Sequence, residues 1–174
     1  SVLAQREIAV DVTKNYFNSL FVFEDCENER FRNKQPEVMK MIVRSYARNI
    51  STEAAVSTII ADLRQNNERT MDVKTYNEYV EALGDLFILE DMPAWNPNIR
   101  SKTSIRSTPT RHFVDTSIAC MALGAGPNDL LKDLESFGLF FEDMAVRDLR
   151  IYAEVNGGEV RHYRDNAGLE CDAV

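Results

Sequence analysis

Three segments in the first half of the chain repeat apolar side chains at the spacing of a buried helical face. In each segment these positions recur at i, i+3, i+4 and i+7, which is the period of an amphipathic helix. The three faces are formed by Met39, Ile42, Val43 and Tyr46; by Val56, Ile59, Ile60 and Leu63; and by Tyr76, Tyr79, Val80 and Leu83. The pattern therefore predicts three consecutive helices that pack on one core.

Residues with strong capping preferences stand at the expected helix ends. Pro36 suits the first position of the first helix, where a backbone N–H has no partner within the helix. The polar run at 49–52 can cap the second helix, and Asp72 can cap the third. Gly84 is placed to terminate the third helix, since glycine tolerates the left-handed backbone that often ends one. Asp115 is expected to cap a further helix.

Two strand-like segments follow the predicted helices, at 86–89 and 112–114, with a polar loop between them. Three short helices, a strand, a loop and a second strand form the order of a winged helix-turn-helix. The sequence therefore predicts a winged-helix-like module over residues 36–114. Before it, residues 1–35 are expected to form a helical linker whose aromatic side chains close the local core. The alternative is that these aromatics face a partner outside the chain.

The loop between the strands carries the basic patch of an otherwise acidic chain. The net charge is −8, yet residues 92–114 contain no Asp or Glu and contribute +4, which leaves −12 for the rest. The four cations are Arg100, Lys102, Arg106 and Arg111. They are candidates for contacts with the phosphates of a nucleic acid, and such contacts would be local and salt-sensitive. The plain alternative is a solvated loop that balances nearby acids.

The third predicted helix argues against DNA reading by this module. Its exposed face offers Lys74, Asn77, Glu78 and Glu81, and two of these four side chains are acidic. Helices that contact phosphates normally present Arg or Lys. We therefore expect a packing or protein-contact role for the module, with DNA contact as the alternative.

Composition is typical of an intracellular domain without a membrane span. Apolar residues make up 44% and charged residues 28% of the 174 residues, and no run approaches the roughly 18 apolar residues of a spanning helix. Three widely spaced cysteines, Cys26, Cys120 and Cys171, favour neither a disulfide framework nor a zinc site. A reduced, cytoplasmic location is expected.

The last 37 residues carry the candidate catalytic chemistry. A helix with Glu142 is followed by a strand, a turn at 166–168, and a strand on which Glu170 and Asp172 share one face. Clustered carboxylates can hold Mg²⁺, which activates water in metal-dependent nucleases. Asp172 would be the central ligand and Glu142 a second one. Capping and solubility are the plain alternative. If the acids lie close together without a cation, at least one should titrate above its usual range.

The sequence of several segments resembles that of a family of prokaryotic AAA-type ATP-binding proteins. The matching words are Gly-Leu-Phe-Phe-Glu at 138–142, Arg-Asp-Leu-Arg at 147–150, His-Tyr-Arg-Asp at 162–165 and Leu-Glu-Cys-Asp at 169–172, with Pro-Ala-Trp-Asn-Pro-Asn at 93–98 and His-Phe-Val-Asp at 112–115 upstream. In that family an ATPase domain precedes a C-terminal domain of unknown function with a winged-helix part and a restriction-endonuclease-like part. The resemblance covers most of residues 36–174.

The departures from that family limit what the resemblance implies. No Gly-x-x-x-x-Gly-Lys-Ser/Thr run exists, so we expect no nucleotide site here, although ATP and Mg²⁺ would serve the whole parent protein. The nuclease-like core also lacks its next strand, which would carry another carboxylate and a lysine. The chain is thus expected to be a fragment of a longer protein, with residues 115–174 as an incomplete nuclease-like α/β unit.

The expected fold class is α+β. The expected function is that of a non-catalytic accessory or regulatory region, whose partners are the missing ATPase domain and a further protein. Metal-dependent cleavage of nucleic acid by the intact protein and DNA binding by the winged helix are the alternatives.

Overall fold

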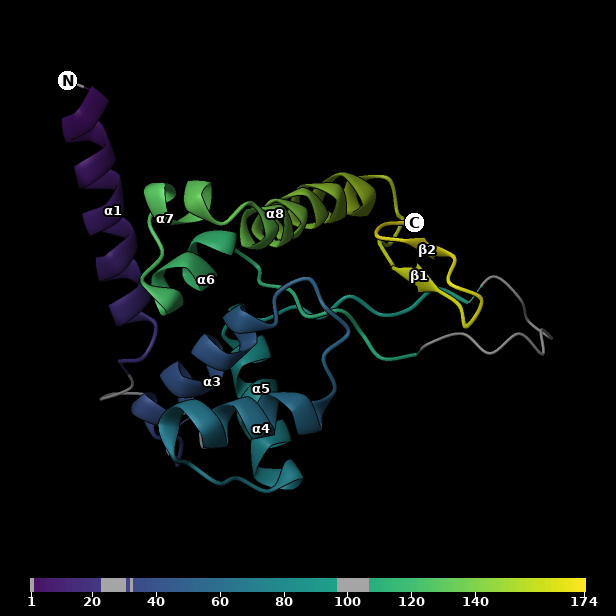
Figure 1. The fold of residues 1–174 in the computed structure, drawn as a ribbon, viewed down its shortest axis with the longest axis horizontal. Coiled ribbons are helices and arrows are strands. Elements are labelled where there is room, and N and C mark those ends of the chain that lie inside the picture. The colour runs from purple at the N-terminus through teal and green to yellow at the C-terminus, as the bar shows by residue number, and fades with distance from the viewer. Residues whose placement is uncertain (1, 23–30, 32, 97–106) are drawn as a thin grey trace.

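The computed structural model of the chain describes residues 2–22, 31, 33–96 and 107–174 (Figure 1). The helices in these ranges are α1 (Val2–Ser19), α3 (Pro36–Arg48), α4 (Val56–Asn67), α5 (Val73–Asp85), α6 (Thr116–Leu123), α7 (Pro127–Lys132) and α8 (Leu134–Val155). The strands are β1 (Tyr163–Arg164) and β2 (Glu170–Cys171), which form one antiparallel pair. Within the described residues the fold is therefore mostly helical.

The predicted α+β class needs a correction at its second half. Residues 115–174 contribute α6, α7 and α8, followed by a hairpin whose strands have two residues each. No nuclease-like α/β unit is evident in the described part of the chain. The motifs at 162–165 and 169–172 lie on this hairpin, whose two-residue strands pair Tyr163 with Cys171 and Arg164 with Glu170. Such a short ladder cannot form the sheet that an α/β unit requires.

The three predicted helices are confirmed as α3, α4 and α5. Pro36 occupies the first turn of α3, and the Asp72 carboxylate caps α5 by accepting a hydrogen bond of 2.9 Å from the backbone N–H of Thr75. Two predicted ends are wrong. Asn49 ends α3 instead of capping α4, which starts at Val56, and Gly84 lies inside α5. Asp115 caps α6 as expected, through the backbone N–H of Ser117.

Helix α3 lies at the centre of the core and packs against α4, α5 and α6 (Figure 1). Its predicted apolar face, Met39, Ile42, Val43 and Tyr46, is completely buried. Removing a side chain of this size from water stabilises the fold by about 1.5–3 kcal/mol. The same core includes Phe21, which follows α1, and Phe140 of α8, so the three segments expected from the sequence share one hydrophobic core.

The two predicted strands are reduced to single bridges in an extended pair of segments. Leu89 bridges to Phe113 and Met92 to Thr110, both antiparallel. Phe87 has a left-handed φ of 54°, which interrupts the extended backbone expected at 86–89. Three helices are followed by an antiparallel pair of extended segments, which is the order expected for the module. Its assignment to the winged-helix class stays a prediction.

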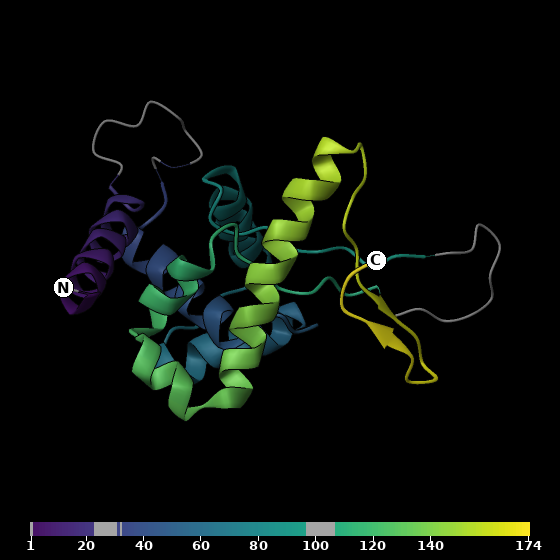
Figure 2. The ribbon, with the colours of Figure 1, turned by 90° about the horizontal axis from the view of Figure 1, so that it is seen from above.

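The C-terminal hairpin lies beside this extended pair (Figure 2). Ala94 and His162 form a parallel bridge, in which the backbone N–H of Trp95 donates to the carbonyl oxygen of His162 at 2.6 Å. The rings of Trp95 and Tyr163 meet edge to face, with centroids 6.0 Å apart. These contacts hold the hairpin against the extended segment at Ala94 and Trp95.

A buried carboxylate fixes α8 against the extended segment. Asp143 is fully buried, and its Oδ1 accepts a hydrogen bond of 2.9 Å from the backbone N–H of Phe113. Its Oδ2 accepts one of 2.7 Å from the hydroxyl of Thr116, and the Nδ1 of His112 lies 3.0 Å from Oδ1. Because Glu142 precedes Asp143, this anchor also sets where Glu142 points.

Among the described helices, none combines the length and the apolar character needed to cross a bilayer.

Candidate acidic pocket

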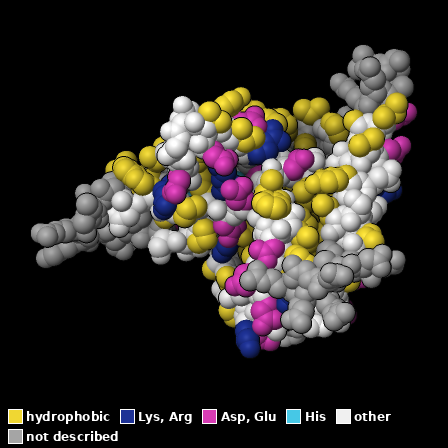
Figure 3. All heavy atoms as spheres, turned by 180° about the vertical axis from the view of Figure 1, so that it is seen from behind, with side chains coloured by type: hydrophobic (Ala, Val, Ile, Leu, Met, Phe, Trp, Pro, Cys, Tyr) yellow, Lys and Arg dark blue, Asp and Glu magenta, His cyan; other side chains and the backbone are white. Residues whose placement is uncertain are grey.

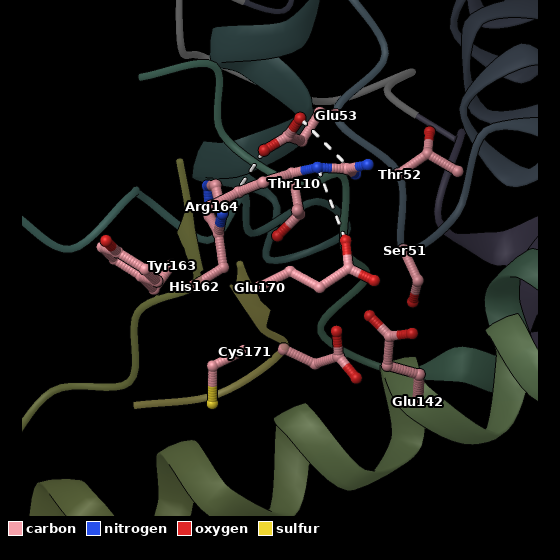
Figure 4. A pocket seen from close by; sticks show the side chains of 11 residues that line it. Ser51, Thr52, Glu53, Thr110, Glu142, His162, Tyr163, Arg164, Glu170 and Cys171 are labelled. Carbon is pink, nitrogen blue, oxygen red and sulfur yellow. Dashed lines mark ion pairs between the residues drawn. The ribbon is translucent and has the colours of Figure 1, made fainter. Parts of the chain in front are cut away.

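The predicted carboxylates meet in one pocket between α8, the hairpin and the loop that follows α3. The cavity has a volume of about 250 Å³ and is shown in Figure 4. Glu142 enters from α8 and Glu170 from β2 (Figure 4). Asp172, the residue after β2, also lines the pocket. The structure therefore brings together all three residues that the sequence singled out, although they are separated by up to 30 positions.

Glu142 is the electrostatically perturbed member of this set. Burial raises its pKa to about 7, and the negative charges of Asp172, Asp143 and Glu170 act in the same direction. This agrees with the expectation that close carboxylates resist joint ionisation. Near neutral pH Glu142 can therefore act as a proton donor or acceptor, whereas an ordinary glutamate is fully ionised.

The pocket also contains Glu53, His162 and Arg164, to which the sequence analysis assigned no role in a site. Arg164 lies between two carboxylates, with its Nη1 3.9 Å from Oε2 of Glu53 and its Nε 3.4 Å from Oε2 of Glu170 (Figure 4). Glu53 is more than 100 positions from the hairpin, so neither spacing nor periodicity could indicate this contact. The arginine offsets part of the negative charge.

His162 reinforces the link between the hairpin and the loop after α3. Its Nδ1 lies 3.7 Å from Oε1 of Glu53, and its Nε2 lies 3.0 Å from the carbonyl oxygen of Thr108. Burial lowers the pKa of His162, which outweighs the attraction of Glu53. The imidazole is thus neutral at pH 7, and its contact with Glu53 is not an ion pair at that pH.

The metal site predicted at Glu142 and Asp172 stays a prediction. No group of three or more His, Cys, Asp or Glu side chains within the described ranges is placed to hold a metal ion. Mg²⁺ prefers octahedral oxygen coordination, and Arg164 occupies the space next to Glu170.

Of the four cations predicted for the basic loop, only Arg111 lies in the described part of the chain, and the prediction for the other three stays open. Arg100, Lys102 and Arg106 lie outside the described residues. Arg111 is only 6% exposed, which excludes it from a phosphate-binding surface. Its guanidinium forms an ion pair with Asp91 and donates a hydrogen bond of 2.9 Å to the carbonyl oxygen of Ala54. Arg111 is therefore a structural residue, a correction that burial alone reveals.

The exposed face of α5 is acidic, as the sequence predicts. Lys74, Asn77, Glu78 and Glu81 all point outward, and Glu78 pairs with Lys34 at 3.2 Å. Helix α5 lies on the rear side of Figure 1, and Figure 3 shows acidic side chains down the middle of that face with isolated Lys and Arg. Tyr76 and Tyr79 are buried, so their predicted core role is confirmed.

Exposed apolar side chains gather on the first and last long helices. On α1, Ile8 and Val12 are about 60% exposed, whereas Phe17 packs against the core. On α8, the exposed set is larger: Leu134, Phe137, Phe141, Met144, Leu149, Ile151, Tyr152 and Val155. Such patches on a folded domain mark contact surfaces.

The described residues thus form a mostly helical domain with a short hairpin and an acidic pocket. The chain belongs to the family defined by a domain of unknown function, DUF8612, whose model matches residues 4–129. The match runs from α1 to α7 and ends before α8, Glu142 and the hairpin. No curated protein and no solved structure matches the chain.

Proposed function

We propose that this chain is a non-catalytic accessory or regulatory region that contacts other protein surfaces, as the C-terminal part of a prokaryotic AAA-type ATP-binding protein. The exposed apolar rows on α1 and α8 carry this proposal. They offer a partner apolar area, while the acidic face of α5 repels a phosphate backbone. The ATPase context is supported by the motifs at 138–142, 147–150 and 162–165.

The test of this proposal uses a longer polypeptide in which an AAA-type ATPase domain precedes this chain. Phosphate release is measured with saturating ATP, before and after deletion of the chain. A regulatory region should change the rate several-fold in either direction, and an unchanged rate contradicts the proposal. The 174-residue chain by itself should give no heat on titration with ATP, because it has no phosphate-binding loop.

A second candidate function is metal-dependent cleavage of nucleic acid by the intact protein. The shared pocket of Glu142, Glu170 and Asp172 favours it. The test incubates a fluorescent duplex with the 174-residue chain and Mg²⁺, with Asp172→Asn as the matched control. We expect no cleavage by either protein. Cleavage that Asp172→Asn abolishes would favour the second candidate over the first.

A further inference from the structure

The outward face of α8 carries a row of exposed apolar side chains, named here the α8 seam. Its members are between 38% and 83% exposed and are Leu134, Phe137, Phe141, Met144, Ile151 and Val155. Successive members are three or four residues apart, and Asp148 occupies the one remaining step. A row that advances by 3.5 residues on average over three heptads is the pattern of helices that pair with other helices.

The α8 seam is not the core-facing side of the helix. That side is formed by Phe140, Asp143 and Val146, which are buried. Figure 2 shows α8 lying across the other helices with its opposite face uncovered. A surface helix is normally polar on its outer face, so a second apolar face indicates a second packing partner.

The size of the α8 seam fits one half of a stable protein interface. The largest apolar patch of an ordinary monomer measures about 300–600 Å². Six large side chains at these exposures, with Tyr152 beside them, present an area on the order of 800 Å². A standard interface buries about that much on each partner. The helix has 22 residues and is therefore about 33 Å long, which suits lengthwise pairing.

We propose that the α8 seam pairs with the α8 seam of a second copy of this chain, in antiparallel orientation. The proposal deepens the contact function above but does not depend on the ATPase context. A two-fold axis brings the same surface of both copies together, so a row that is apolar along its whole length is complementary to itself. Heptad spacing lets the side chains of one row fill the gaps in the other.

The single charge in the row, Asp148, selects the antiparallel orientation. Parallel pairing in register would place the two Asp148 carboxylates next to each other, and like charges at such a seam are destabilising. The midpoint of the helix lies between Met144 and Ala145. Antiparallel pairing about this point separates the two Asp148 residues by about 10 Å along the axis, at 1.5 Å per residue. Charges at that distance are largely screened at physiological salt.

Sedimentation of the 174-residue chain over a range of concentrations tests the dimer. We expect a dimer with a dissociation constant in about the micromolar range, weakened at least about tenfold by Phe141→Glu. Val155→Glu, at the end of α8, serves if Phe141→Glu fails to fold. Val73→Glu, an equally exposed apolar position on α5, is the matched control and should leave the dimer unchanged. Circular dichroism checks that each variant keeps its helices.

Two results would overturn the dimer. One is a wild-type chain that stays monomeric at about 100 µM, well above the expected dissociation constant. The other is a dimer that both seam variants leave intact, which would place the interface elsewhere. A monomeric chain that still changes the ATPase rate would overturn the dimer and leave the proposed contact function standing.

Cross-linking tests the orientation. The three native cysteines are replaced by serine, and Leu134→Cys and Val155→Cys are introduced in separate chains. Antiparallel pairing should give a disulfide only after the two chains are mixed, because residue 134 of one copy faces residue 155 of the other. If a sample of one variant alone forms a disulfide, two copies of the same position lie next to each other. That result would overturn the antiparallel arrangement.

Discussion

Helices α3 and α8 both press one face into the core, but their outward faces differ. On α3 the outer face carries charges that have partners: Lys40 with Glu37, and Arg48 with Asp62 of α4. On α8 the outer face is a row of exposed apolar side chains. The comparison teaches that α3 is fully packed within this chain, whereas α8 has one packed face and one that remains available for a partner.

The largest expected effect comes from the buried face of α3. Ile42→Ala should lower the free energy of unfolding by about 4 kcal/mol, because it removes a fully buried side chain and leaves a cavity. Phe141→Ala on the outer face of α8 should change it by less than about 0.5 kcal/mol in the monomer. Urea titration of dilute protein measures both. An equal loss in the two variants would mean that the outer face of α8 is already packed.

Replacing the buried acid of α8 should destabilise the fold more than replacing the exposed acid. Asp143→Ala leaves the N–H of Phe113 and the hydroxyl of Thr116 without their acceptor, and should destabilise the fold by about 3 kcal/mol. Asp148→Ala, next to Arg147 at the surface, should change stability by less than about 0.5 kcal/mol. Thermal unfolding followed by circular dichroism compares the two. A mild effect of Asp143→Ala would show that α8 is held by its apolar contacts alone.

The raised pKa of Glu142 should make the free energy of unfolding depend on pH. Its folded pKa of about 7 is above the value of about 4.3 in an unfolded chain, so the folded state binds the extra proton. The stability that this residue contributes is therefore complete below about pH 4 and is lost as the pH rises through 7. The full pKa difference corresponds to about 3.7 kcal/mol, and solvent screening at this half-buried side chain reduces the expected loss to about 2 kcal/mol. Glu142→Gln should flatten this part of the profile in urea titrations, and an unchanged slope would assign it to another group.

The smallest effect is expected at Asp172. Its charge raises the pKa of Glu142, so Asp172→Asn should stabilise the chain by less than about 1 kcal/mol at pH 7 and lower that pKa. Urea titration and an NMR titration of the Glu142 side chain measure the two changes. If Asp172→Asn unfolds the chain, then Asp172 is a structural hydrogen-bond acceptor and its link to Glu142 is secondary.

Local patterns predicted the helical module well. The apolar spacing of α3, α4 and α5 and the caps at Asp72 and Asp115 depend on neighbours within one or two turns, and these predictions are confirmed. The predicted cap of α4 was wrong, because Asn49 ends α3 instead. Short-range preferences identify a cap but not always the helix that it serves.

The features that the sequence did not predict depend on contacts between distant parts of the chain. The three acids of the pocket were found through their motifs, but the pairing of Arg164 with Glu53 depends on how the hairpin meets the loop after α3. Arg111 resembled a surface cation, and only its burial beside Tyr46 and Asp91 shows its structural role. The nuclease-like α/β unit predicted for residues 115–174 is not evident in the described part of the chain, because the strand-like segments at 162–172 form only a short hairpin there.

The anchoring of Asp143 has a consequence for the mechanics of α8. Successive side chains of a helix differ by about 100° in direction, so the hydrogen bonds of Asp143 fix the rotation of α8 about its own axis. Glu142 then points into the pocket and the α8 seam points outward, at an angle that neither can change alone. A partner that turned α8 would have to break the contacts of Asp143 first, and would move Glu142 away from the hairpin as it did so.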